Sequence, residues 1–154
     1  MMKFIFGTVA AGVLALALPV FAQPASRTKQ TASSTHNGSP TQIAHGKYVV
    51  TRVAGCADCH TPMDNKGQPL PGKWLKGSKL SFGPLVPFPA WATTAPDIAG
   101  LPGWSTQDAV HLLMTGQGPD GHRPRPPMPQ YRMNHADATA VVAYLDSVGR
   151  RGSK

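Results

Sequence analysis

The sequence predicts a small all-α domain in which three main helices and long loops surround one large bound group. Three segments follow the helical period of about 3.6 residues, at 41–54, 105–116 and 134–149. The segments between them are interrupted by many of the 16 Pro and 16 Gly residues of the chain. Loops of this length are unusual inside a compact domain. A large buried cofactor, which the loops can wrap, accounts for them.

The only two cysteines of the chain lie in the motif Cys56-Ala57-Asp58-Cys59-His60. The spacing Cys-x-x-Cys-His is the attachment signature of a c-type haem. On one helical turn Cys56, Cys59 and His60 share a face, so two thiols can bond the vinyl groups while the imidazole binds the iron. A redox-active cysteine pair would be expected in a βαβ pattern, and a zinc site would need more thiolates. We therefore predict one covalent haem c, held by Cys56 and Cys59, with His60 as an iron ligand.

The N-terminal residues 1–22 have the features of a secretory signal peptide. Lys3 supplies the positive charge, an uncharged apolar run follows, and Val20-Phe21-Ala22 offers small residues at the positions that a signal peptidase reads. An uncleaved anchor is the alternative, because the run approaches the minimum length of a membrane span. Both interpretations predict export, and we expect a periplasmic protein with no membrane span after cleavage.

The remaining chain is expected to hold one folded domain. Residues 23–40 are mostly Ser, Thr, Pro, Gln and Gly, which predicts a disordered linker. Cleavage would leave 132 residues (154 − 22), enough for one domain with one core. We place this domain at 41–150 and a short basic tail at 151–154.

The first predicted helix contains a glycine on its apolar face. That face is formed by Ile43, Gly46, Val50 and Val53. A glycine inside a helix costs about 1 kcal/mol relative to alanine. Gly46 therefore indicates a close crossing with another helix, with a tolerated surface glycine as the alternative.

The other two predicted helices have recognisable ends. Ser105 and Asp108 form a capping box at the start of the second helix, and Gly116 is expected to end it. The third helix is expected to begin at Asn134 and to stop at Gly149.

The loop after the haem motif, 61–103, is expected to wrap the haem. A proline carbonyl from Pro69 or Pro71 is our candidate acceptor for the second imidazole N–H of His60. Side chains expected to pack against the cofactor or the core are Trp74, Leu75, Leu80, Phe82, Leu85, Phe88 and Trp91. Candidates for binding the haem propionates are Trp74, Arg123 and Arg125.

Met128 is the candidate for the second iron ligand. It lies within Pro126-Pro127-Met128-Pro129, where prolines restrict the chain and would hold the sulfur in place. A thioether suits haem iron opposite a histidine. Met133 is the competitor, although it lacks the flanking prolines. The metal ligands are therefore predicted to be His60 and Met128.

With these residues in hand, the chain resembles a class I cytochrome c. The matching pieces are Gly46, residues 56–62, Gly103-Trp104-Ser105, Pro127-Met128-Pro129 and Val142-Ala143-Tyr144-Leu145. The set Ala95-Pro96-Asp97, Gly103-Trp104-Ser105, Asp120-Gly121 and Pro127-Met128-Pro129 is similar to the haem c modules of exported alcohol and sugar dehydrogenase complexes. This resemblance implies a small class I cytochrome c fold around one haem. It also implies thioether bonds to Cys56 and Cys59, iron ligation by His60 and Met128, and a crossing of the N- and C-terminal helices at Gly46.

Composition favours an electron carrier over an enzyme. The chain has no Glu and only seven scattered Asp, and no Ser-His-Asp or phosphate-binding motif is present. A haem with both axial positions filled can do little but change its iron oxidation state. Two alternatives remain. One is a haem protein that binds a gas or reduces peroxide, with His111, His122 or His135 as a distal group; the other is an electron-transfer subunit docked on a dehydrogenase.

The net charge of +8 can be ordinary solvated surface charge, but the clustering of basic residues in the two haem-contacting loops indicates an acidic redox partner, such as a dehydrogenase or a terminal oxidase. An exported haem protein would rarely meet nucleic acid, so none is expected as a partner. Basic residues expected to surround the haem edge are Lys73, Lys76, Lys79, His122, Arg123 and Arg125.

Overall fold

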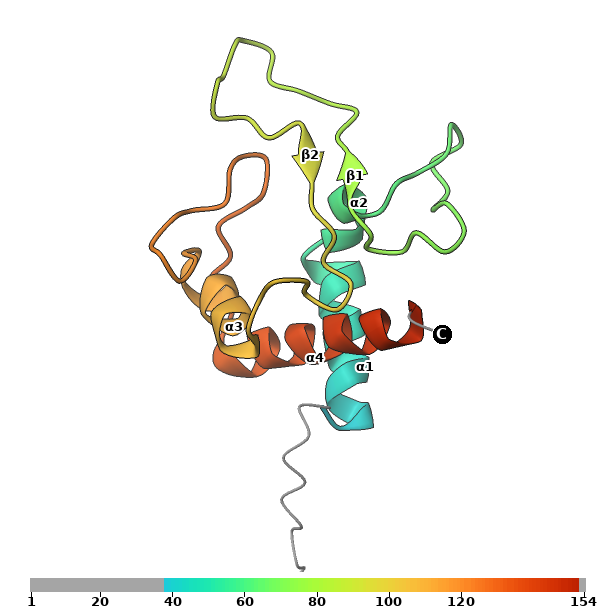
Figure 1. Ribbon diagram of the computed structural model, residues 1–154, viewed down its shortest axis with the longest axis vertical. Coiled ribbons are helices and arrows are strands. Elements are labelled where there is room, and N and C mark those ends of the chain that lie inside the picture. Colours follow the sequence, from blue (N-terminus) through green and yellow to red (C-terminus); the bar gives the residue numbers. More distant parts are fainter. Residues whose placement is uncertain (1–37, 153–154) are drawn as a thin grey trace, which may run out of the picture. The chain divides into compact units, whose positions relative to one another are not determined.

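Helices form most of the regular structure in the computed structural model, which describes residues 38–152 (Figure 1). The helices are α1 (Pro40–Tyr48), the π-helical η1 (Val49–Val53), α2 (Cys56–His60), α3 (Thr106–Thr115) and α4 (His135–Gly152). Two short strands, β1 (Ser78–Lys79) and β2 (Thr94–Ala95), pair antiparallel. The all-α prediction is confirmed, with the three main helices at the predicted places. The predicted signal peptide at 1–22 and most of the predicted linker lie outside the described residues.

The first helix begins slightly earlier than predicted and changes its winding before it ends. The backbone N–H of Gln42 donates to the Ser39 hydroxyl, and Pro40 occupies the first turn, where its missing N–H costs nothing. The helix therefore starts at Pro40, inside the segment that was assigned to the linker. At its other end the backbone N–H of Ala54 donates to the carbonyl of Val49, 2.8 Å away, which gives the wider π-helical turn of η1.

Helix α4 crosses α1 at Gly46, as predicted (Figure 1). Gly46 is buried, and a Cβ atom there would lie 1.8 Å from the backbone oxygen of Ala140. Only glycine permits this approach. Beside the crossing lie the buried side chains of Val50, Val141 and Leu145, with Tyr144 buried as well. The crossing forms the centre of the hydrophobic core, and α3 adds Ala109 and Leu113 from a second side of α4.

The caps of α3 and α4 confirm the predicted starts of both helices, but the predicted end of α4 is wrong. Ser105 accepts from the Asp108 N–H, and Asn134 accepts from the Asp137 N–H. Gly116, with φ of 69°, ends α3. By contrast, α4 continues past Gly149 to Gly152 and so enters the segment assigned to the basic tail. None of the described helices is long and apolar enough to cross a membrane.

Gly149 serves as a contact point and not as a helix end. A Cβ atom on Gly149 would lie 2.4 Å from the Cα atom of Gly100. The N–H of Gly100 donates to the carbonyl of Leu145 at 2.9 Å. The loop before α3 is therefore fixed directly onto the backbone of α4, and glycine is required on both sides.

The chain between β1 and β2 forms a projecting loop whose tip we call the apolar loop (residues 81–90). Figure 1 shows this yellow-green segment extending away from the helices, beyond the two strands. Leu75 is fully buried, as predicted, but every residue of the apolar loop is exposed. The side chains of Phe82, Leu85 and Phe88 therefore do not pack against the hydrophobic core, although the ring of Phe82 contacts that of Trp91. The strands direct this part of the chain outward, and none of residues 81–90 belongs to the hydrophobic core.

Candidate functional site

Helix α2 presents the Cys-x-x-Cys-His motif as a single helical turn. Gly55 precedes it in the left-handed region, with φ of 61°, a conformation that favours glycine and that turns the chain from η1 into α2. Cys56 and Cys59 are partly exposed and carry free thiols, whereas His60 is buried. The helix therefore places both thiols and the imidazole within one turn, as the motif predicts.

The imidazole of His60 is fixed by a backbone carbonyl. Its Nδ1 atom lies 2.8 Å from the carbonyl oxygen of Pro96, which can only accept, so Nδ1 carries the proton. The prediction of Pro69 or Pro71 as the acceptor is wrong, because it is the segment after β2 that reaches His60. Burial lowers the pKa of His60, and the bond to Pro96 opposes this only in part. The ring is thus held neutral with Nε2 left as a free electron pair, the form that binds a metal.

Two further contacts hold α2 against the following loop. The buried hydroxyl of Thr61 accepts from the N–H of Leu75 at 3.0 Å, and the His60 carbonyl accepts from the N–H of Gly77 at 2.8 Å. The carbonyl of Leu75 in turn accepts from the N–H of Ile98. These bonds give His60 a defined position, since its backbone and its ring are both held by segments distant in sequence.

The environment of the two thiols does not favour redox chemistry. Burial raises the pKa of Cys56 to about 11, and burial together with the charge of Asp58 raises that of Cys59. Reactive cysteine pairs need a lowered thiol pKa instead. Across residues 38–152, no group of three or more His, Cys or acidic side chains is arranged to hold a metal ion. The raised thiol pKa values count against the disulfide-exchange alternative.

Tyr131 is a residue of this site that the sequence reasoning missed. Its hydroxyl donates to the Ala54 carbonyl at 2.6 Å and lies within hydrogen-bonding reach of the Cys56 thiol. Burial and the neighbouring Cys56 raise the pKa of Tyr131, so it stays protonated. Tyr131 therefore joins the chain after Met128 to the start of the haem motif. The residues next to Tyr131 in the sequence do not indicate this role, because its two partners, Ala54 and Cys56, are 77 and 75 positions away.

Met128 is partly buried in what we call the methionine loop (residues 123–130). Its N–H donates to the carbonyl of Arg125 at 3.2 Å, which closes a turn through the two intervening prolines. The peptide bond between Pro126 and Pro127 is cis. The turn closed by the Met128 N–H gives the loop a defined course, as expected from its prolines.

A short stretch of chain connects the methionine loop with His60. The N–H of Ala92 donates to the carbonyl of Pro126 at 2.6 Å, and four residues later Pro96 accepts from His60. Five residues span at most about 18 Å. The loop with Met128 and the helix with His60 are thus joined through one common segment, residues 92–96.

Arg125 strengthens this connection. Its guanidinium donates to the carbonyls of Pro89, Ala90 and Trp91, at 3.2, 3.0 and 2.8 Å. The Arg125 guanidinium therefore holds the end of the apolar loop against the methionine loop through these three hydrogen bonds.

The polar groups around these loops fit a cofactor that carries carboxylates. The indole Nε1 of Trp91 is buried and has no acceptor among the described residues. An unpaired buried donor is rare and costs about 1–3 kcal/mol, so this N–H fits a carboxylate supplied by a bound haem. The three earlier propionate candidates have other partners: Trp74 donates to the Tyr144 hydroxyl, Arg123 to the Gln130 side chain, and Arg125 as described above.

The predicted ring of basic side chains is only partly available for a partner. Lys76 pairs with Asp97 at 3.5 Å, and Arg125 and Arg123 are engaged within the chain. His122 pairs with Asp120. Lys73 and Lys79 remain exposed.

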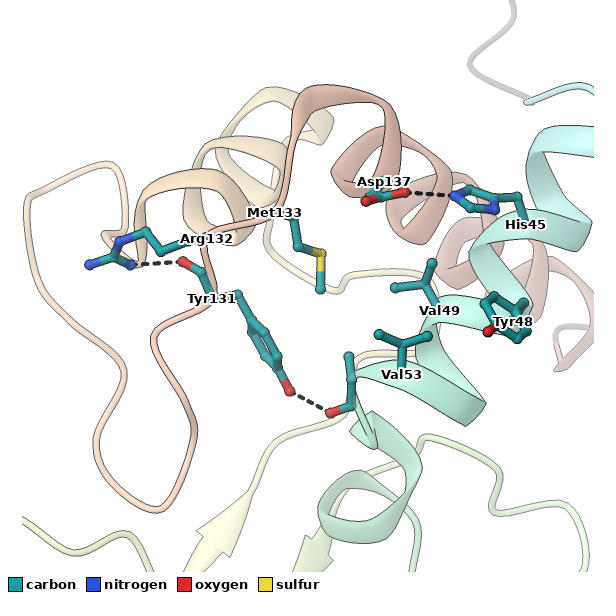
Figure 2. Close-up of a pocket in the computed structure, with 9 residues that line it drawn as sticks. His45, Tyr48, Val49, Val53, Tyr131, Arg132, Met133 and Asp137 are labelled. Atoms are coloured by element: carbon teal, nitrogen blue, oxygen red, sulfur yellow. Dashed lines mark hydrogen bonds and ion pairs between the residues drawn. The ribbon is translucent and has the colours of Figure 1, made fainter.

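Figure 2 shows a pocket between α1, η1 and the start of α4. Its volume is about 500 Å³, and Ala54 and Tyr131 bring it next to the start of the haem motif. The thioether of Met133 lies among the lining side chains, and Met133 also packs against the hydrophobic core. The other lining residues are His45, Tyr48, Val49, Val53, Ala54, Tyr131, Arg132 and Asp137. Neither Cys56, Cys59, His60 nor Met128 is among them. Met133 therefore has a packing role that Met128 lacks.

Comparison with known proteins agrees with this geometry. The family model described as Cytochrome c matches residues 43–149. The fructose dehydrogenase cytochrome subunit of Gluconobacter japonicus is 31% identical over 113 residues, which cover 67% of this chain and 21% of that protein. A diheme cytochrome c-type protein of Cereibacter sphaeroides is 29% identical over 109 residues, which cover 67% of this chain and 34% of that protein. The chain thus spans between a fifth and a third of the length of these curated relatives.

Proposed function

We propose that this chain, which belongs to the cytochrome c family, carries single electrons between redox partners through one covalently bound haem c. The count of one rests on the single Cys-x-x-Cys-His motif of this chain. The haem iron supplies the one-electron change between Fe(III) and Fe(II).

The observation that carries the proposal is the arrangement of α2. Cys56 and Cys59 are free thiols one turn apart, beside an imidazole whose Nδ1–H is already donated to Pro96. This arrangement supports covalent attachment through both cysteines and iron binding through His60 Nε2.

Met128 is proposed as the second ligand because the other methionines have different environments. Met114 and Met133 pack against the hydrophobic core, and Met63 is 37% exposed three residues after His60. Met128 lies in the loop that is tied to residues 92–96, and its prolines restrict the motion of the sulfur. A histidine and a methionine as axial ligands favour electron transfer and leave no open position for a gas or peroxide.

Two measurements test this proposal: whether the haem is covalently bound to the polypeptide, and whether carbonmonoxide can reach the iron. In a denaturing gel followed by a haem peroxidase stain, the haem should travel with the polypeptide, and the Cys56→Ala, Cys59→Ala double variant should accumulate little holoprotein. The ferrous wild-type protein should bind carbonmonoxide poorly. Complete extraction of the haem by acid-acetone would refute covalent attachment, and ready carbonmonoxide binding would favour a gas-binding or peroxide-reducing protein.

The proposed export follows from residues 1–22, whose charge and apolar run match a secretory signal. Covalent haem attachment suits a periplasmic protein. Edman sequencing of the protein purified from the periplasm should begin at Gln23 if the signal is cleaved as proposed.

A second candidate is a cytochrome subunit docked on a dehydrogenase. It is favoured by the likeness to the fructose dehydrogenase cytochrome subunit. Both candidates use the same haem chemistry and differ in how long the partner stays bound. Size-exclusion chromatography of the protein from its native source distinguishes them, because a docked subunit should elute with a dehydrogenase and a free carrier should elute alone.

A further inference from the structure

Four of the large apolar side chains that are exposed in the described chain lie within the apolar loop. Leu85 is 104% exposed and Val86 70%, with Phe82 and Phe88 at 51% and 47%. Exposed apolar surface concentrated in one place usually marks an interaction site. Figure 1 shows that this segment projects beyond β1 and β2, so the tip is free to meet a partner without rearrangement of the helices.

The composition of the loop suits an apolar phase. No side chain between Ser81 and Trp91 carries a hydrogen-bonding group. Pro84, Pro87 and Pro89 have no backbone N–H, so fewer backbone donors would lose water on insertion. A protein interface normally uses polar side chains to fix its orientation, and residues 82–90 provide none.

The stretch of sequence that contains the loop is positively charged. Between Asp64 and Asp97 the sequence contains four lysines and no acidic residue. Lys79 lies in β1, at the base of the projecting segment, and both Lys79 and Lys73 are exposed. Apolar side chains at a tip with lysines nearer the body match a surface that has anionic groups above an apolar interior.

We infer that the apolar loop binds an anionic phospholipid surface, with Leu85 and Val86 inserted among the acyl chains and Lys73 and Lys79 near the headgroups. Binding of this kind is reversible, because one short loop buries little apolar area. Lipid binding would keep the electron carrier close to membrane-bound redox partners. This inference holds whichever partner the carrier serves.

The test is cosedimentation of the haem-loaded protein with sucrose-filled vesicles. One set contains equal parts of phosphatidylglycerol and phosphatidylcholine, and the other contains phosphatidylcholine alone. We expect binding to the anionic vesicles and a decrease as salt rises from about 0.05 to about 0.5 M. The Leu85→Ser, Val86→Ser double variant should bind at least about tenfold more weakly. The Lys73→Gln, Lys79→Gln variant should lose about tenfold on anionic vesicles only.

Val53→Ser is the matched control. Val53 is 64% exposed on η1, so its change removes exposed apolar surface elsewhere and should leave lipid binding unchanged. An unchanged thermal midpoint and haem spectrum would show that each variant is folded. The inference is overturned if the wild-type protein does not bind anionic vesicles at low salt, or if the loop double variant binds as well as wild type. If that variant keeps lipid binding but loses electron transfer with a dehydrogenase, the loop is a protein-docking surface instead.

Discussion

The indole N–H of Trp91 is a buried hydrogen-bond donor that lacks an acceptor in the described part of the chain. The neighbouring N–H of Ala92 is bonded to Pro126, so Trp91 lies beside the loop that carries Met128. A carboxylate of the proposed haem would supply the missing acceptor, and a charge-assisted bond of this kind is stronger than a neutral one.

Trp91→Phe should therefore destabilise the holoprotein by about 1–3 kcal/mol, because it keeps most of the ring but removes the donor. Chemical denaturation followed by the haem absorbance measures the change. Trp104→Phe is the control: Trp104 is 37% exposed, and its change should stay within about 0.5 kcal/mol. Equal stability of Trp91→Phe and wild type would mean that no carboxylate meets this N–H.

Met128→Ala should lower the reduction potential and allow ferrous iron to bind carbonmonoxide, because methionine ligation raises the potential and fills the position. Redox titration and optical spectra measure both effects. Met133→Leu keeps the volume of a core side chain and should leave both properties unchanged. If Met133→Leu changes the potential and Met128→Ala does not, the ligand assignment must be exchanged.

The sequence identifies a functional residue when the neighbouring positions form a recognisable pattern around it. The motif around Cys56 and the prolines around Met128 are contained in a few positions, so the sequence alone marks both as candidates. The acceptor for His60 was placed at Pro69 or Pro71, whereas Pro96 supplies it from 36 positions away. A carbonyl acceptor has no sequence signature, since every residue carries one.

At the scale of elements, the crossing of α1 and α4 is the contact most sensitive to added volume. A Cβ atom on Gly46 would meet the backbone of Ala140, which cannot move aside as a flexible side chain can. Gly46→Leu should cost about 1–3 kcal/mol through overpacking, measured by urea denaturation of the holoprotein. Ala44→Leu on the exposed side of α1 should change stability by less than about 0.5 kcal/mol. Equal losses in the two variants would contradict a specific effect at the crossing.

Helix starts were predicted more reliably than the uses of glycine. Ser105 and Asn134 bond backbone groups three residues later, so their role is local and visible in the sequence. Gly149 was assigned as a stop, but it contacts Gly100, which is 49 positions away. A glycine needed for close contact and one needed for a left-handed turn look alike in a sequence. Only the packing of distant segments separates the two cases.

At the scale of the whole molecule, the exposed lysines should determine the rate at which partners meet. Electron transfer with an acidic partner should slow as salt rises, because charges separated by more than about 10 Å are screened at 0.1 M. Stopped-flow kinetics under second-order conditions measure this effect. Lys73→Gln, Lys79→Gln should reduce both the rate at low salt and its salt dependence, whereas Lys47→Gln on α1 should change them less. A rate that does not vary with salt would exclude electrostatic steering.

The contacts of Arg125 have a consequence for how the folded protein fluctuates. Its bonds to Pro89, Ala90 and Trp91, together with the bond from Ala92 to Pro126, join two loops that are distant in sequence. Neither loop can leave its place without breaking the bonds that hold the other, so they should open as one cooperative unit. The backbone amides of Ala92 and Met128 should then exchange with deuterium at similar opening free energies. In Arg125→Gln both should exchange faster by the same factor, and Met128 would then loosen together with the apolar loop.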